Sequence, residues 1–359
     1  MDRRHFLHSA GLSFAALRLG GASAFAQPAT PAPGWQTYEV TTHVEIRKPA
    51  GETHVWLPVP MIRADFQKPL GNRIECLGGT AREITQGGVS MAHGKFAAGS
   101  DAQLTVVSRV ATRNHAVDLQ HGAISHSESS GSLKVWLQPS AGVPVDGIVL
   151  KKATEITRGA STDIEKARAI YEWIVENTYR NGKIRGCGRG DIRFMLESGD
   201  MGGKCADLNA LFVGLARASG LPARHAYGLR IAPSEFGYKS LGTTTPTKGQ
   251  HCRAEVYLKG HSWFPVDPAD VRKVVLEEPP GNLSLSDEKV VTARSRLFGS
   301  WEMNWMAFNY AADVTLPGSR FDKLIYFMYP QAETADGRLD PFDPDAFRYT
   351  ITASRVATS

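Results

Sequence analysis

The sequence of 359 residues lacks the features that mark several common classes of binding protein. It has no long block of one charge sign, and its formal net charge of +5 is dispersed, which argues against nucleic acid as a partner. A G-x-x-x-x-G-K-[ST] loop and a G-x-G-x-x-G strand–helix junction are both absent, so nucleotide binding has no support. No apolar run is long enough to span a bilayer as a permanent helix, and we expect no stable membrane insertion.

Cysteine is also scarce. The four cysteines are Cys76, Cys187, Cys205 and Cys252, and the chain has neither a C-x-x-C nor an H-x-x-x-H pair. The paired spacing of an ordinary structural zinc site is therefore missing. An oxidising compartment would allow disulfides, but a free catalytic thiol would leave three cysteines and so at most one disulfide.

The first residues predict a targeting signal. The pair Arg3-Arg4 is followed by a moderately apolar stretch over 10–19, and Ala24-Phe25-Ala26 places small residues at the two positions that a signal peptidase recognises. We expect residues 1–26 to be a twin-arginine signal peptide that directs the folded protein to the periplasm. Residues 27–34 are rich in proline and are expected to form a linker.

The rest of the chain has a globular composition, with 42% hydrophobic and 9% aromatic residues, and its length suits two domains. Residues 37–47 and 103–111 alternate along the chain, and turns rich in glycine, asparagine and aspartate separate such runs. This pattern predicts an antiparallel β-sandwich-like domain over 35–145. The short apolar runs 135–137 and 148–150 are expected to be strands.

Two helices are predicted in the region that follows. Thr162 and Glu165 form a capping box before an apolar stripe at helical spacing, and this helix should end near Arg180. A second apolar stripe begins near Cys205, and Gly220 provides its left-handed C-terminal cap.

Cys205 follows two glycines and opens the second helix. The glycines in Gly202-Gly203-Lys204-Cys205 let the backbone turn sharply into the helix. The N-terminus of a helix has a partial positive charge and unpaired N–H groups, which favour a thiolate and could stabilise an oxyanion. Taken alone, Cys205 is equally compatible with a small buried hydrophobic residue.

A thiolate enzyme also needs a base and a group that orients the base, and the next hairpin offers both. His251 lies on the polar face of the predicted strand 251–258, and Asp267 ends its partner strand, which begins at Trp263. One slip of register would put the two side chains on opposite faces. They share a face only if the loop after Leu258 has an odd length or the pair contains a bulge. A three-residue loop would make them diagonal neighbours.

The order of these segments resembles the transglutaminase-like superfamily. Its members combine a Gly-x-Cys helix start, an Arg-Ala/Ser-x-Gly-Ile/Leu-Pro-Ala-Arg segment, a histidine on a strand and an aspartate that ends the partner strand. Here Arg217-Ala218-Ser219-Gly220-Leu221-Pro222-Ala223-Arg224 matches the middle segment, and the resemblance extends over about 161–270. The segment Trp56-Leu57-Pro58-Val59-Pro60 also resembles the β domain that precedes the catalytic core in exported bacterial members.

The resemblance implies acyl transfer without a metal or other cofactor. A Cys205 thiolate would attack an amide carbonyl of a peptide or protein, such as a cell-envelope peptide, with His251 as general acid and base and Asp267 as the orienting carboxylate. Cross-linking members place a tryptophan upstream of the nucleophile as an oxyanion donor, whereas Asp200 and Met201 stand here. A cysteine peptidase or amidase is therefore favoured over a transglutaminase.

The expected architecture is an α+β fold, in which the antiparallel β-sandwich-like domain precedes a papain-like transglutaminase core. We place the catalytic core at 146–290. Residues 291–359 are expected to be a mixed C-terminal extension that closes the core, with strands near 323–329 and 347–356.

Two alternatives fit the same residues. Cys205, His251 and Asp267, with Cys187, have the ligand types of a zinc site. The other alternative is a non-catalytic envelope-binding module with a transglutaminase-like fold. Cys187 itself lies in a basic loop that is expected to be flexible, which makes it a candidate for disulfide exchange with Cys205. Cys252 faces the core by strand parity.

Overall fold

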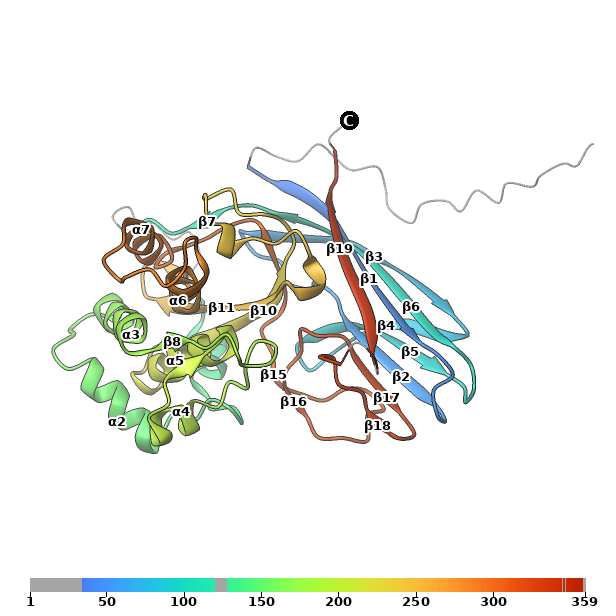
Figure 1. Ribbon diagram of the computed structural model, residues 1–359. Helices are drawn as coiled ribbons and strands as arrows, with labels where there is room; N and C mark the ends of the chain where they lie inside the picture. Colours follow the sequence, from blue (N-terminus) through green and yellow to red (C-terminus); the bar gives the residue numbers. More distant parts are fainter. Residues whose placement is uncertain (1–33, 120–127, 344, 346, 358–359) are drawn as a thin grey trace, which may run out of the picture.

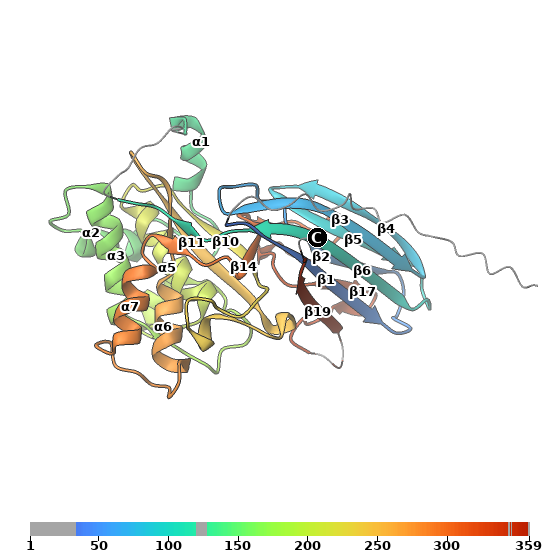
Figure 2. The same cartoon turned by 90° about the horizontal axis from the view of Figure 1, so that it is seen from above.

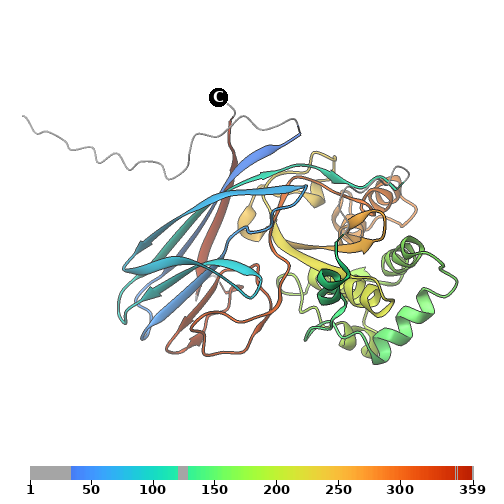
Figure 3. The ribbon, with the colours of Figure 1, turned by 180° about the vertical axis from the view of Figure 1, so that it is seen from behind.

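The protein is described here by a computed structural model that covers residues 34–119, 128–343, 345 and 347–357. The predicted signal peptide lies outside these residues. Figure 1 shows two units side by side, one rich in helices and one built of β-strands. The same division is seen from above in Figure 2 and from behind in Figure 3. Within the described ranges, no helix combines the length and apolarity needed to cross a membrane.

The β unit is a sandwich of two antiparallel sheets. One sheet has the strand order β19 (Arg348–Arg355), β1 (Gln36–Ile46), β6 (Ala102–Thr112) and β3 (Gln67–Leu77). The other has the order β18 (Gly337–Arg338), β17 (Gln331–Thr334), β2 (Thr53–Pro58), β5 (Val89–Phe96) and β4 (Gly79–Gln86). Side chains from both sheets, among them Val44, Leu57 and Leu104, pack into one apolar cluster. The predicted sandwich is thus confirmed.

The helical unit surrounds a four-stranded antiparallel sheet. Its strand order is β12 (Ser262–Val266), β11 (Gln250–Leu258), β10 (Ala223–Arg230) and β14 (Trp305–Asn309). The helix α5 (Cys205–Ala218) packs against β10 and β11, and its residues from Cys205 to Ala216 are all buried. The other helices are α2 (Gly147–Ile156), α3 (Asp163–Asn177), α4 (Ile192–Ser198), α6 (Pro268–Glu277) and α7 (Glu288–Arg296).

Short elements connect the two units. They are α1 (Ser130–Lys134), three 3₁₀ turns (Val135–Leu137, Lys239–Leu241 and Pro246–Lys248), the strand pair β7 (His115–Ala116) with β13 (Ser300–Trp301), and the pair β15 (Ala312–Val314) with β16 (Leu324–Tyr326). The expected strands at 135–137 and 148–150 are therefore wrong. The first run is a 3₁₀ turn and the second lies inside α2, because three apolar residues fit either structure.

The end of the chain contributes to both units, whereas we had assigned 291–359 to an extension of the core. Only β14 joins the core sheet; β17, β18 and β19 join the sandwich. The last strand, β19, pairs with β1 from Tyr38–Arg355 to Glu45–Arg348, so the two ends of the described chain form adjacent strands. Short alternating strands do not reveal which sheet they will join, since pairing is long-range.

The helix α3 has the predicted capping box, in which Thr162 accepts from the Glu165 N–H and the Glu165 carboxylate accepts in return. It ends at Asn177 rather than near Arg180. Residues Tyr179–Arg180 instead form β8, which pairs in parallel with β9 (Gly202–Gly203). This pair fixes the backbone directly before Cys205.

We expect the substitution Phe347→Ala to destabilise the sandwich, because Phe347 is 1% exposed and belongs to the cluster between its two sheets. Losing a buried aromatic side chain costs about 3–5 kcal/mol of unfolding free energy. Urea unfolding would measure this loss. The matched control is Phe194→Ala at a side chain that is 62% exposed, for which we expect a change of about 0.5 kcal/mol or less. Equal effects of the two substitutions would contradict the placement of the C-terminal segment in the sandwich.

Candidate active site

Cys205 is the first residue of α5 and is 4% exposed. The two preceding glycines are required by close packing rather than by a left-handed backbone conformation. A Cβ atom on Gly203 would lie 2.7 Å from Cβ of Asp207, and one on Gly202 would overlap the Tyr179 ring. The glycines therefore allow β9 to lie against β8 and to deliver Cys205 to the start of the helix.

The loop that contains Cys187 is fastened to the start of α5. The Asp207 carboxylate accepts hydrogen bonds from the backbone N–H groups of Arg189 (2.9 Å), Gly190 (2.8 Å) and Lys204 (2.9 Å). The Cys187 carbonyl accepts from the N–H of Ala206 at 2.9 Å. Cys187 is consequently buried, in contrast to the flexible loop that we expected. The Ala206 N–H, one of the donors expected to be free at this helix end, is already occupied.

The hairpin has the register that the predicted geometry requires. Leu258 pairs with Ser262, so the loop between β11 and β12 has three residues, and Gly260 in this loop has a φ of 88°. The last pair of the ladder is Ala254 with Val266. Asp267 therefore comes one residue beyond the end of β12, where its side chain reaches His251. The expected odd loop length is confirmed.

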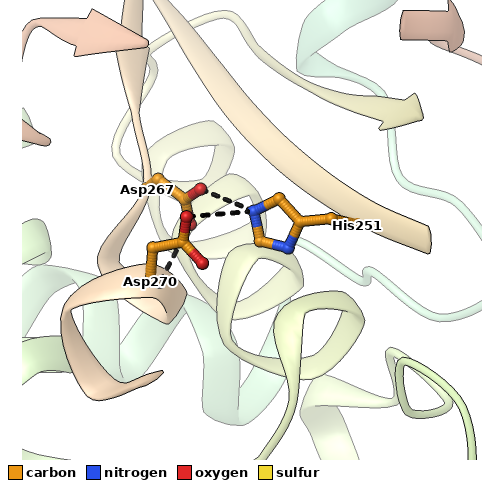
Figure 4. Close-up of side chains that lie close together, drawn as sticks. All are labelled: His251, Asp267 and Asp270. Atoms are coloured by element: carbon orange, nitrogen blue, oxygen red, sulfur yellow. Dashed lines mark hydrogen bonds and ion pairs between the residues drawn. The ribbon is translucent and has the colours of Figure 1, made fainter. Parts of the chain in front are cut away.

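His251 and Asp267 form a buried pair (Figure 4). Nε2 of His251 lies 2.7 Å from Oδ2 of Asp267 and 3.5 Å from Oδ2 of Asp270. Asp267 is fully buried, and it also caps α6 by accepting from the N–H of Asp270 at 3.1 Å. Because Nε2 is used by the carboxylates, Nδ1 is the ring nitrogen left to act on Cys205, which shares the cavity lining with this histidine.

Three further polar residues, which the sequence analysis did not identify, hold this pair. Asn209, one helical turn after Cys205, donates through Nδ2 to Oδ1 of Asp267 (3.1 Å) and to the Cys252 carbonyl (2.8 Å). Asp270 accepts two hydrogen bonds from Nη2 of Arg230, at 2.6 and 2.7 Å. A buried asparagine within an apolar stripe is itself a signal, because buried polar groups need partners. Asp270 and Arg230 gave no comparable signal.

The electrostatics of the site favour an imidazolium–thiolate pair. Burial and Arg230 would lower the pKa of His251, but the carboxylates of Asp270 and Asp267 outweigh them and raise it. Burial would raise the pKa of the Cys205 thiol, yet the neighbouring Cys187 and Cys252 thiols and the His251 ring, with its charge, hold that pKa well below its ordinary value.

The four cysteines are free thiols in the structure, and three of them meet here. Burial and the neighbouring Cys205 raise the pKa values of Cys187 and Cys252 well above the ordinary range, so both remain protonated. Cys187 receives a hydrogen bond from the Tyr329 hydroxyl at 3.0 Å, and its sulfur lies 3.2 Å from the Gln250 carbonyl oxygen. Cys252 is fully buried, as parity predicted, but it also contacts Cys205.

The residues whose ligand atoms lie close enough to share a metal ion differ from the zinc ligands considered above. Among the described residues, the one group with ligand atoms close enough to share an ion is His251, Asp267 and Asp270, without Cys205. These atoms already bond to one another, and the Arg230 guanidinium opposes a cation at Asp270. The arrangement therefore suits a proton-sharing pair better than a zinc centre.

A cavity of about 430 Å³ opens beside Cys205 and His251. One wall comes from the loop that follows β10, including Thr243, Thr247 and Lys248. Another part of the lining comes from the end of the chain and consists of Tyr329, Phe342, Phe347 and Tyr349. The sandwich therefore completes the pocket, although the candidate nucleophile, base and carboxylate all belong to the helical unit.

Comparison with known proteins places this site in a family. The family model of the transglutaminase-like superfamily matches residues 151–268, which include Cys205, His251 and Asp267. An uncharacterized protein of Haemophilus influenzae is 32% identical over 366 residues, covering 94% of this chain and 98% of the relative.

One solved structure shows a similar fold at low sequence identity. The crystal structure of a candidate cysteine protease from Cytophaga hutchinsonii superimposes with a TM-score of 0.52 and 15% identity, covering 89% of this chain and 98% of that chain. The periplasmic domain of TgpA from Pseudomonas aeruginosa matches with a TM-score of 0.32 and 15% identity, over 67% of this chain and 88% of that chain. From the near-full-length relative and the matched core, the chain belongs to the transglutaminase-like superfamily.

Proposed function

We propose that this protein is an enzyme that transfers acyl groups from amide bonds of peptides or proteins to water, through Cys205, His251 and Asp267. The observation that supports this best is the fully buried His251–Asp267 pair, joined at 2.7 Å beside a cysteine at the start of a helix. Nucleophile, base and orienting carboxylate are the three parts that such chemistry needs.

In the proposed mechanism, the Cys205 thiolate attacks the amide carbonyl carbon and forms a C–S bond. The imidazolium of His251 gives its proton to the amine nitrogen as the C–N bond breaks, which leaves a thioester. Water then attacks the thioester; His251 takes a proton from this water, and the C–S bond breaks to release the carboxylic acid. Asp267 holds the ring orientation and stabilises its charged form throughout.

Hydrolysis is favoured over cross-linking. Among the described residues, no tryptophan lines the cavity that could serve as the oxyanion donor of the cross-linking enzymes. Trp173, the candidate nearest upstream in sequence, belongs to α3 and is partly buried against the core. A water-resolved reaction also needs no second site for an amine.

The proposal predicts selective alkylation of Cys205. Iodoacetamide should modify Cys205 faster than Cys76 or Cys252 at pH 6, because its lowered pKa keeps the thiolate populated where ordinary thiols are protonated. His251→Ala should reduce this rate on the order of tenfold or more at pH 6, since each pKa unit is a factor of ten in thiolate. Peptide mapping by mass spectrometry measures both rates.

Alkylation and hydrolysis assays together distinguish the proposed enzyme from a zinc site and from a binding module. Treatment with EDTA should leave the alkylation rate and the hydrolysis of peptide substrates unchanged, whereas a zinc site would lose activity and release zinc in elemental analysis. Cys205→Ser should abolish hydrolysis, and Cys76→Ser should not. An alkylation rate at Cys205 no greater than at Cys252 would contradict the enzyme proposal and favour a binding module.

A second prediction concerns Asp267. The substitution Asp267→Asn removes a carboxylate that raises the pKa of His251, so the imidazolium that stabilises the thiolate is lost at a lower pH. The pH midpoint of Cys205 alkylation should therefore rise, by about one unit or roughly tenfold in rate below the midpoint. The exposed Asp336→Asn is the matched control. An unchanged pH profile in a folded Asp267→Asn variant would rule out an electrostatic role for Asp267.

We also propose that the protein is exported to the periplasm by the twin-arginine pathway. The support is the Arg3-Arg4 pair and the small residues at 24 and 26. Replacing both arginines by lysine should retain the full-length precursor in the cytoplasm. The exported wild-type protein should begin at Gln27, as measured by intact mass. Identical processing and location of the two forms would contradict this route.

A further inference from the structure

The cavity beside Cys205 has an unusual charge balance. Its lining includes five basic side chains and, among the residues that the structure describes, no acidic one. The five are Arg180, Lys204, Arg230, Lys248 and Lys273. A concave, partly apolar surface with one sign of charge concentrates its field on the ligand and recruits the opposite charge.

Carboxylates near the cavity neutralise the charge of these basic side chains only in part. Arg230 is paired with Asp270 at 2.6 Å. Arg180 and Lys273 share one carboxylate, Glu277, which Lys273 approaches at 3.7 Å. The two carboxylates of Asp270 and Glu277 therefore balance the charges of three cations only in part.

The remaining two cations have no such partner. No carboxylate in the described ranges lies within ion-pair distance of Lys204 or Lys248. Lys204 is the residue directly before Cys205, and Lys248 is exposed at the opposite loop. The thiolate of Cys205 does not cancel this excess, because the His251 imidazolium offsets it.

Lys248 is held in place by the sandwich. It ends the 3₁₀ turn Pro246–Lys248, whose Thr247 hydroxyl accepts from the N–H of Ile351 at 2.8 Å and lies 3.1 Å from the Ile351 carbonyl oxygen. Ile351 belongs to β19, the strand that also supplies Tyr349 to the cavity. Lys248 and Tyr349 are thus anchored to the same strand, so a basic and an aromatic part of the lining lie close together.

We infer that the cavity recognises acyl substrates that bear a carboxylate close to the reacting carbonyl, as an acidic peptide does. Lys248, with Lys204, attracts the carboxylate, and the rings of Tyr329, Phe342 and Tyr349 contact the hydrocarbon part. This inference rests on the proposed function, since it assigns the substrate class of the same site. It makes Lys248 a residue for specificity and not for the chemical step.

Two small alkylating agents of similar size test the inference without a known substrate. Iodoacetate is an anion and iodoacetamide is neutral; with either, the thiolate forms a C–S bond and iodide leaves. The ratio of their rate constants at Cys205 should exceed the ratio for free cysteine by about fivefold at low ionic strength. The excess should shrink in 0.5 M NaCl, because salt screens the lysines.

Variants locate the effect. Lys248→Gln should bring the ratio down toward that of free cysteine, and Lys248→Arg should retain the excess. Lys151→Gln is the matched control, because Lys151 is exposed on α2 and does not line the cavity. A ratio equal to that of free cysteine, or one that Lys248→Gln does not lower, would overturn the inference. If iodoacetamide itself failed to modify Cys205, the proposed function would fall instead.

Peptides that protect Cys205 from alkylation can show whether the recognised carboxylate is a side chain or a C-terminus. Each of three short peptides is added before iodoacetamide: one with a glutamate side chain and an amidated C-terminus, one with glutamine and a free C-terminus, and one neutral at both. Protection of Cys205 by the first assigns an acidic side chain, and protection by the second assigns a C-terminal carboxylate. Equal protection by the neutral peptide would contradict recognition of any carboxylate.

Discussion

The buried carboxylate of Asp267 is the interaction on which the rest of the site depends. It directly follows β12, caps α6, accepts from Asn209 of α5 and binds His251 of β11. One fully buried group thereby joins a helix, a hairpin and a following helix at a single point. A charge in this position is costly unless it is satisfied, and here the histidine, the amide of Asn209 and the nearby Arg253 at 3.7 Å satisfy it. The geometry of His251 and Asp267 is therefore fixed by the core itself.

The second constraint is the start of α5. The glycines of β9 bring the chain close to β8, and the Asp207 carboxylate fastens the Cys187 loop across the same helix end. The helix N-terminus is consequently enclosed on one side by a thiol and a backbone carbonyl, and it opens on the other side to the cavity. The three thiols differ: the surroundings lower the pKa of Cys205, whereas they raise the pKa values of Cys187 and Cys252.

Much of this could be predicted from the sequence where the signal is local. The capping box of α3, the apolar stripe of α5 and the odd length of the loop after Leu258 each depend on a few neighbouring residues, and all three are confirmed. The Asp267-Pro268 pair was also a helix-start signal, although we interpreted it only as a strand end. Strands β3 and β4 were not predicted, because most of their side chains are exposed or half-buried and buried and exposed positions do not alternate along them. Contacts between distant segments, such as Arg230 with Asp270, leave no mark in the local pattern.

The pairing of β19 with β1 has a consequence for how the protein comes into being. During synthesis, Cys205, His251 and Asp267 are all joined to the chain well before Tyr349 and Ile351. Until those last residues arrive, β1 lacks one neighbour and the loop with Lys248 lacks its anchor. A nascent or prematurely terminated chain therefore has the three side chains of the proposed active site but an unfinished pocket, so the wall built by Tyr349 forms last.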